Sequence, residues 1–169
     1  MNKKMLAAMN DQIQAELYSA YLYLSMAAYY ESLNLPGFAN WMRLQAEEEN
    51  LHGMKFFDYI IDRGGRVELK AIDAPPADFE DPLTAFKMAY EHETMVTARI
   101  HKLYKLAVEE HDFPSQSLLT WFVDEQVEEE KSTLEVVEQL EMVGDHKMGL
   151  FMVDRELGQR QPGAGGEGE

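Results

Sequence analysis

Two sets of three residues in this 169-residue chain combine carboxylate, amide and imidazole side chains at the same spacing: Glu16, Glu49 and His52, then Glu93, Gln126 and Glu129. In each set the second residue lies 33 positions after the first, and the third lies 36 positions after the first. Oxygen ligands with one imidazole and no sulfur suit iron or manganese better than a structural zinc ion. Two such sets also suit a pair of metal ions about 3.5–4 Å apart that share bridging carboxylates.

These residues fall on helix faces that are otherwise apolar. At about 100° per residue, Glu49 and His52 lie inside the apolar stripe of their helix, whereas Glu47 lies on the opposite side. An isolated buried carboxylate is strongly unfavourable and normally takes up a proton. A single core glutamate is more often paired with an arginine, but no Arg or Lys falls near the middle of the four faces. The repeated spacing therefore favours a bound cation as the partner.

The stretches that carry these residues are rich in Ala, Leu, Met, Glu and Gln, which form helices well. Pro and Gly separate them, which predicts long helices over roughly 4–33, 38–63, 83–110 and 115–143, and a short one over about 147–157. The turns near Pro36 and Pro114 are short, whereas the link from Gly64 to Asp81 is long enough to cross a bundle. The prediction is an all-α four-helix bundle with one long crossover and a short fifth C-terminal helix.

Composition excludes several classes of function. The chain has 31 Asp and Glu against 15 Lys and Arg, a net charge of −16, so we expect neither nucleic acid nor an anionic membrane as a partner. The absence of cysteine excludes disulfides, zinc–thiolate sites, iron–sulfur clusters and thiol catalysis. No signal peptide or membrane span is visible in the sequence, so we expect a cytoplasmic protein. Residues 1–158 form the predicted domain, and residues 159–169 a disordered glycine-rich tail.

At these residues the sequence resembles the prokaryotic non-haem ferritins, over essentially residues 5–158. Four segments carry the resemblance in order and spacing: Ala15–Ser19, Glu48–His52, Tyr90–Glu93 and Trp121–Lys131. The resemblance implies a ferritin-like fold and a homo-oligomeric 24-mer cage that binds iron and no haem. Gln126 and Glu129 stand where bacterioferritins and rubrerythrins have a Glu-x-x-His, and Asn50 stands where bacterioferritins have the haem-ligating methionine. Both differences favour the non-haem branch.

The resemblance also implies roles for single residues. These are a first iron held by Glu16, Glu49 and His52 with Gln126 nearby, a second iron held by Glu93 and Glu129 with Glu49 as the bridge, and a third iron toward the interior at Glu48, Glu125 and Glu128 with Glu129. Tyr23 matches a tyrosine that the family keeps beside the di-iron site. Trp121 matches a nearby tryptophan, and bundle packing explains it equally well.

The leading hypothesis is an iron-storage ferritin, a ferroxidase that oxidises Fe(II) with O2 or H2O2 and keeps Fe(III) mineral in its cage. The alternative is a rubrerythrin-like di-iron peroxidase without a storage cage. Typical rubrerythrins append a cysteine-ligated module, so the absence of cysteine counts against it. A non-catalytic helical scaffold would have no reason to repeat the ligand spacing. His92 is predicted to lie off the core face, at a surface or subunit contact.

Overall fold

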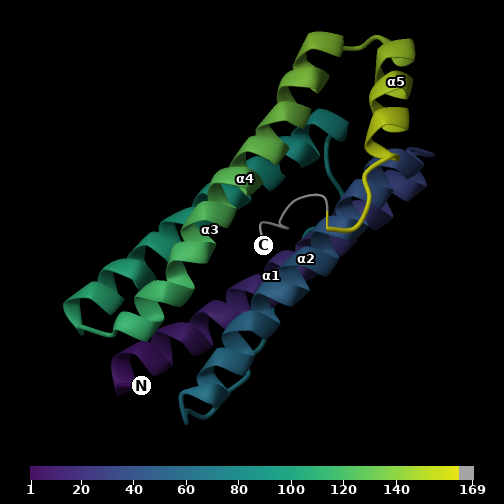
Figure 1. The fold of residues 1–169 in the computed structure, drawn as a ribbon. Helices are drawn as coiled ribbons and strands as arrows, with labels where there is room; N and C mark the ends of the chain where they lie inside the picture. Colours follow the sequence, from purple (N-terminus) through teal and green to yellow (C-terminus); the bar gives the residue numbers. More distant parts are fainter. Residues whose placement is uncertain (164–169) are drawn as a thin grey trace.

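A computed structural model describes residues 1–163, and within that range the chain forms five helices and no strand (Figure 1). The helices are α1 (Lys3–Ser32), α2 (Pro36–Asp62), α3 (Pro82–Glu109), α4 (Phe113–Val143) and α5 (Lys147–Leu157). The α1–α2 hairpin and the α3–α4 hairpin lie against each other, and α5 packs on α2 and α4. The predicted all-α bundle with a short fifth helix is confirmed. No helix in the described range is long and apolar enough to cross a membrane.

Side chains cap the helices where the sequence places Asn or Asp before them. Asn2, Asp81 and Asp112 each accept a hydrogen bond from a backbone N–H in the first turn of α1, α3 and α4. The residue before α2 makes no such side-chain bond. Instead, the carboxylate of Asp154 on α5 accepts from two backbone N–H groups at the start of α2, at 2.8 and 3.1 Å. This contact fixes α5 to the first turn of α2.

The long crossover, residues 63–81, runs along α1 from one end of the bundle to the other. The side chain of Asn10 accepts a hydrogen bond from the backbone N–H of Glu68 at 2.7 Å. Fifteen residues further along α1, Ser25 donates to the carbonyl of Pro76 at 2.6 Å. The crossover therefore carries the chain back to the end where α1 finishes, and α3 can run antiparallel to α1.

A polar layer divides the apolar core of the bundle into two clusters. One cluster packs Tyr30, Phe38 and Phe86 together at the end of the bundle where α1 finishes, and α5 packs against this cluster. The other stacks Phe56 on Phe122, with ring centres 4.2 Å apart. The buried polar side chains between the clusters include Glu16, Glu49, His52, Glu93, Gln126 and Glu129. These are the residues that the repeated spacing singled out.

Residues 158–163, which follow α5, turn back along α2 toward the middle of the bundle (Figure 1). Arg160 lies there against α2, and its guanidinium sits over the ring of Trp41 with Cζ 4.6 Å from the ring centre. The predicted tail, residues 159–169, extends past this point, and residues 164–169 lie outside the described part of the chain. The boundary at residue 158 stays a prediction.

Candidate metal centre

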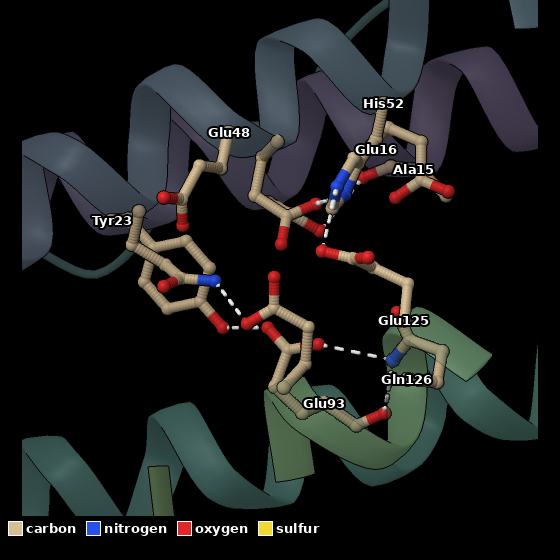
Figure 2. Close-up of polar contacts among 12 residues, drawn as sticks. Ala15, Glu16, Tyr23, Glu48, His52, Glu93, Glu125 and Gln126 are labelled. Carbon is tan, nitrogen blue, oxygen red and sulfur yellow. Dashed lines mark hydrogen bonds and ion pairs between the residues drawn. The ribbon is translucent and has the colours of Figure 1, made fainter. Parts of the chain in front are cut away.

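Carboxylates from all four long helices converge in the polar layer (Figure 2). Glu16, Glu49 and His52 each offer one ligand atom, and these atoms all lie within 4.8 Å of one another. Glu49, Glu93 and Glu129 form a second group by the same measure. Glu49 belongs to both groups, so its carboxylate stands between the two hairpins. The structure thus brings the first predicted set together, and it brings Glu93 and Glu129 of the second set to Glu49. The role of each residue as a ligand stays a prediction.

Several oxygens of these carboxylates lack the partners that burial demands. Glu16 and Glu49 are each 1% exposed and Glu93 is fully buried. Among the described residues, neither carboxylate oxygen of Glu49 has a hydrogen-bond partner, nor has Oε2 of Glu16. Burial raises the pKa of Glu49 well above its ordinary range and the pKa values of Glu93 and Glu129 to about 8, with neighbouring carboxylates adding to each shift. Such groups hold either protons or cations.

Neighbouring side chains fix the orientation of Glu93. Gln126 donates from Nε2 to Oε2 of Glu93 and to Oγ1 of Thr97, each at 3.2 Å. Tyr23 donates its hydroxyl to Oε1 of Glu93. Burial and the surrounding carboxylates raise the pKa of Tyr23 well above its ordinary value, so it remains a neutral phenol. The structure therefore places Gln126 against a residue of the second group.

Two further buried glutamines, which the repeated spacing does not include, hold other candidate ligands. Gln12 donates from Nε2 to Oε1 of Glu16 at 2.9 Å, and Gln45 donates from Nε2 to Oε2 of Glu129. A sequence signal for them exists, because each glutamine precedes a predicted ligand on its own helix by four residues, one helical turn. Gln45 precedes Glu49 as Gln12 precedes Glu16.

The three residues predicted for a third site lie in different surroundings. Glu125 is buried, its Oε1 is 3.8 Å from Nε2 of His52, and it forms a group of possible ligands with His52 and Glu129. Glu128 is exposed. Glu48 lies to one side of this group (Figure 2), and its Oε2 is paired with an arginine from beyond α5. Among the described residues, only Glu125 of the three joins such a group.

His92 is buried, which corrects its predicted place at a surface or subunit contact. Its Nε2 lies 2.7 Å from Oγ of Ser19, and its ring meets the edge of Tyr23 at 6.0 Å. Helix α1 covers this flank of α3, which the helical wheel of α3 alone does not reveal. Burial lowers the pKa of His92 to about 4, so the ring is neutral near pH 7.

Trp121 lies at the edge of the polar layer. Its ring meets the ring of His52 edge to face, with centres 5.5 Å apart, and the ammonium of Lys55 sits 3.3 Å from the ring centre. Trp121 also contacts Phe122 of the apolar cluster. The residue therefore packs the bundle and flanks a candidate ligand at the same time.

The amino-acid sequence matches one protein family and several curated relatives along most of its length. Residues 6–143 match the family described as the ferritin-like domain. A bacterial non-heme ferritin of Staphylococcus aureus is 40% identical over 160 residues, which cover 95% of this chain and 96% of the relative. A bacterial non-heme ferritin of Staphylococcus haemolyticus is similar to the same extent.

Two solved structures that resemble this chain are also ferritins, like the sequence relatives. An open-pore ferritin from the hyperthermophilic archaeon Archaeoglobus fulgidus superimposes with a TM-score of 0.95 at 52% identity, covering 95% of this chain and 99% of that one. A closed form of the Archaeoglobus fulgidus ferritin, engineered by site-directed mutagenesis, gives a TM-score of 0.94 at 52% identity. It covers 95% of this chain and 98% of that one.

Proposed function

Because the chain belongs to the ferritin family of iron-storage proteins, we propose that it oxidises Fe(II) at a di-iron centre between its two hairpins and stores the Fe(III) product inside a homo-oligomeric cage. Iron is here both the substrate and the cargo. The carboxylate and imidazole groups of the polar layer offer the oxygen and nitrogen ligands that iron takes.

The observation that carries this proposal is the position of Glu49. Its carboxylate belongs to both ligand groups, it is buried, and both of its oxygens lack hydrogen-bond partners among the described residues. Nδ1 of His52 lies 3.5 Å from Oε2 of Glu49, too far for a good hydrogen bond. A buried carboxylate that accepts no hydrogen bond is unfavourable unless a cation or a proton neutralises it. Two cations, one on each oxygen, would satisfy both oxygens at once.

Each hairpin then supplies the remaining ligands of one iron. We propose Glu16 and His52 with Glu49 for the first ferrous ion, and Glu93 and Glu129 with Glu49 for the second. The second group has three carboxylates and no imidazole, so the two ions would have unequal surroundings. Gln126 and Tyr23 act on Glu93 through hydrogen bonds and keep its carboxylate directed at the centre.

Two ferrous ions side by side match the electron count of the oxidants. Each Fe(II) gives up one electron, and one O2 takes both electrons with two protons to become H2O2. With H2O2 as the oxidant, two electrons and two protons yield two water molecules. The carboxyl protons that burial retains in the metal-free site are released when Fe(II) binds, so protons are available where the oxidant is reduced.

A third iron site belongs to the same proposal. Glu125 next to His52 supports it, because a cation there would also contact Glu129. Glu48 and Glu128 complete the set that the resemblance implies. For Glu48 to bind iron through Oε2, its present partner Arg160 must leave.

A closed shell of identical subunits is the assembly that storage requires, because Fe(III) polymerises and precipitates near neutral pH. We propose a 24-mer cage with α5 near the four-fold axes. Leu150, Phe151 and Met152 support the proposal, because Phe151 and Met152 are exposed apolar side chains of the short α5 and Leu150 is half-buried. Part of the net charge of −16 would line the cavity and attract cations. The cytoplasmic location stays a prediction.

The rubrerythrin-like alternative has no support among the relatives described above, which are ferritins. Light scattering measures the mass of the native particle and so tests this alternative directly. A particle far larger than a dimer that takes up iron as mineral fits the proposed cage. A stable dimer that reduces peroxide without retaining iron would contradict storage.

The di-iron assignment is tested by comparing Glu49→Ala with Glu47→Ala, because Glu47 is an exposed glutamate on the same helix. Both variants remove one carboxyl side chain from α2. Glu49→Ala should bind fewer Fe(II) ions per subunit under anaerobic conditions and lose fast Fe(II) oxidation, while Glu47→Ala should match the wild type. A folded Glu49→Ala protein with wild-type stoichiometry and rate would contradict the proposed bridge.

A further inference from the structure

Arg160, three residues beyond α5, has both polar and aromatic partners on α2. Its Nη2 lies 2.5 Å from Oε2 of Glu48, and its Nη1 donates to Oε1 of Gln45 at 2.9 Å and to the carbonyl of Trp41 at 3.4 Å. The side chain is only 13% exposed, and it stacks on the Trp41 ring. A guanidinium with a charged partner, two neutral acceptors and an aromatic face is held in one orientation.

Through Gln45, Arg160 reaches a proposed iron ligand. Gln45 is completely buried, accepts from Arg160 with Oε1 and donates from Nε2 to Glu129. A guanidinium can only donate, so it binds the oxygen end of the amide and leaves the nitrogen end for the carboxylate. Arg160 and Glu129 therefore hold opposite ends of the same amide and fix its orientation together.

The same arrangement occurs at the other end of the polar layer. Arg99 donates from Nε to Oε1 of Gln12 at 3.2 Å, and Gln12 donates from Nε2 to Oε1 of Glu16 at 2.9 Å. An arginine and a glutamine thus orient one outer ligand in each group. Arg99 belongs to α3, within the bundle, whereas Arg160 comes from the segment that follows α5.

Arg160 also takes the place that a cation would occupy on Glu48. One oxygen of Glu48 is paired with the guanidinium, and the other is buried without a hydrogen-bond partner among the described residues. A divalent ion and a guanidinium compete for the same carboxylate. A cation that binds Oε2 of Glu48 must therefore displace Arg160 and, with it, the contact that orients Gln45. A cation at Oε1 alone would lie next to the positive guanidinium, which disfavours binding there.

We propose that Arg160 is a positioning residue that strengthens binding of the second iron, through Gln45 and Glu129, and excludes a third cation from Glu48 until it is displaced. This inference rests on the proposed di-iron centre. It makes the segment after α5 part of the metal site. Loading of the third site would loosen Glu129, and that would favour departure of the product from the second site.

The test is titration of metal-free protein with Zn(II), a divalent ion that does not change oxidation state. Arg160→Gln is compared with Arg155→Gln, an exposed arginine of α5 that matches the loss of charge. Calorimetry gives the affinity of each ion, and anomalous scattering from zinc-soaked crystals gives its position. Arg160→Gln should bind the second ion about 10-fold more weakly, the lower end of effects seen when the partners of a metal ligand are removed. The same variant should bind a further ion at Glu48 that wild type and Arg155→Gln bind only at higher concentration.

The opposite directions of the two changes separate this role from simpler ones. A mere loss of positive charge would strengthen binding at every position, and a loss of folding would weaken it at every position; either result overturns the proposal. Unchanged binding in Arg160→Gln overturns it as well.

A second variant, Gln45→Met, breaks the link to Glu129 and leaves the pair between Arg160 and Glu48 intact. This variant should weaken binding of the second ion alone and should create no new cation site at Glu48. A Gln45→Met protein with wild-type affinity for the second ion overturns the positioning role. If wild-type protein binds no ions at the two Glu49 groups, the proposed function fails with this inference. If wild type binds both ions and Arg160→Gln behaves identically, only the inference fails.

Discussion

Tyr23 on α1 donates its hydroxyl to the carboxylate of Glu93 on α3, and both side chains are completely buried. The contact joins the two hairpins at the polar layer. It also gives Glu93 a neutral donor, because the phenol keeps its proton. A neutral donor orients the carboxylate without competing as a cation for the metal. Tyr23 therefore positions a candidate ligand.

Tyr23→Phe should leave one buried oxygen of Glu93 without its donor. An unsatisfied buried acceptor costs about 1–3 kcal/mol, so the metal-free protein should unfold at a lower temperature. The less ordered Glu93 should weaken binding of the second divalent ion, measured by Zn(II) calorimetry. Tyr21→Phe is the matched control, because Tyr21 lies on the same helix and is 51% exposed. Wild-type affinity and stability in Tyr23→Phe would contradict the role assigned to this hydrogen bond.

The stability of the metal-free protein should fall as the pH rises from about 6.5 to 8. In the folded chain burial raises the pKa values of Glu93 and Glu129 from 4.5 to about 8, so the folded state holds protons that the unfolded state has released. The stabilisation from these protons is complete below pH 4.5 and is lost as the pH rises toward 8. His92 has the opposite effect, because its pKa is lowered from 6.5 to about 4. The stabilisation from His92 is complete above pH 6.5 and is lost as the pH falls from 6.5 toward 4.

Measurements between pH 6.5 and 8 therefore isolate the carboxyl groups. The thermal midpoint of chelator-treated protein should decline across this window, and the decline should become shallower in Glu93→Gln, which lacks one of the protonated groups. Saturation with Zn(II) should remove most of the decline, since the metal replaces the protons. A midpoint that rises across the same window in metal-free wild type would refute the assignment.

Gln126→Glu should affect the metal-free and metal-bound proteins in opposite directions. The substitution places a carboxylate where the amide now donates to Glu93 at 3.2 Å, so two acidic groups would face each other. We expect a thermal midpoint lower by about 2–4 °C without metal, which corresponds to about 1 kcal/mol in a chain of this size. We also expect roughly tenfold tighter binding of the second divalent ion, because an added anionic ligand raises affinity. Weaker binding of that ion would show that Gln126 does more than hold Glu93.

The fold could be predicted from the sequence because its signals are local. Pro36 and Gly64 mark helix ends, the connector to Asp81 is too long for a turn, and the structure has helices within a few residues of the expected bounds. Asp154 was not predictable in this way. It caps α2 from 117 residues away, and no local pattern indicates that the start of one helix will meet the side chain of another.

The candidate ligands could be predicted from the sequence, as could Tyr23 and Gln126, which orient Glu93. The residues that orient Glu16 and Glu129 could not. Glu16 and Glu49 stand out because a carboxylate on an apolar face is conspicuous. A glutamine there attracts less attention, so Gln12 and Gln45 were missed although each lies one turn before a ligand. Arg160 was missed for a different reason. It reaches Glu48 only because α5 directs the following residues back onto α2, which is a property of the tertiary structure.

Gly37→Ala should detach α5 from α2 and release Arg160. A Cβ at Gly37 would lie 1.6 Å from the carbonyl oxygen of Asp154, so the two helices cannot keep their present distance. Crowding of this kind typically costs about 1–3 kcal/mol. We expect a lower thermal midpoint and faster hydrogen exchange in residues 147–160, measured by mass spectrometry.

Gly53→Ala is the control, because it adds the same methyl group to the same helix. Its Cβ would meet its nearest neighbour, Leu17, at 3.4 Å, an ordinary contact. Alanine is also preferred to glycine within a helix by up to about 1 kcal/mol, so this variant should be as stable as wild type or more so. Gly37→Ala is also compared with Arg160→Gln in the same Zn(II) titration. If Gly37→Ala also weakens binding of the second Zn(II) ion and allows a cation to bind at Glu48, the docking of α5 controls the metal site through Arg160. Slow exchange in residues 147–160 of Gly37→Ala would instead show that α5 stays docked without the close approach at Gly37.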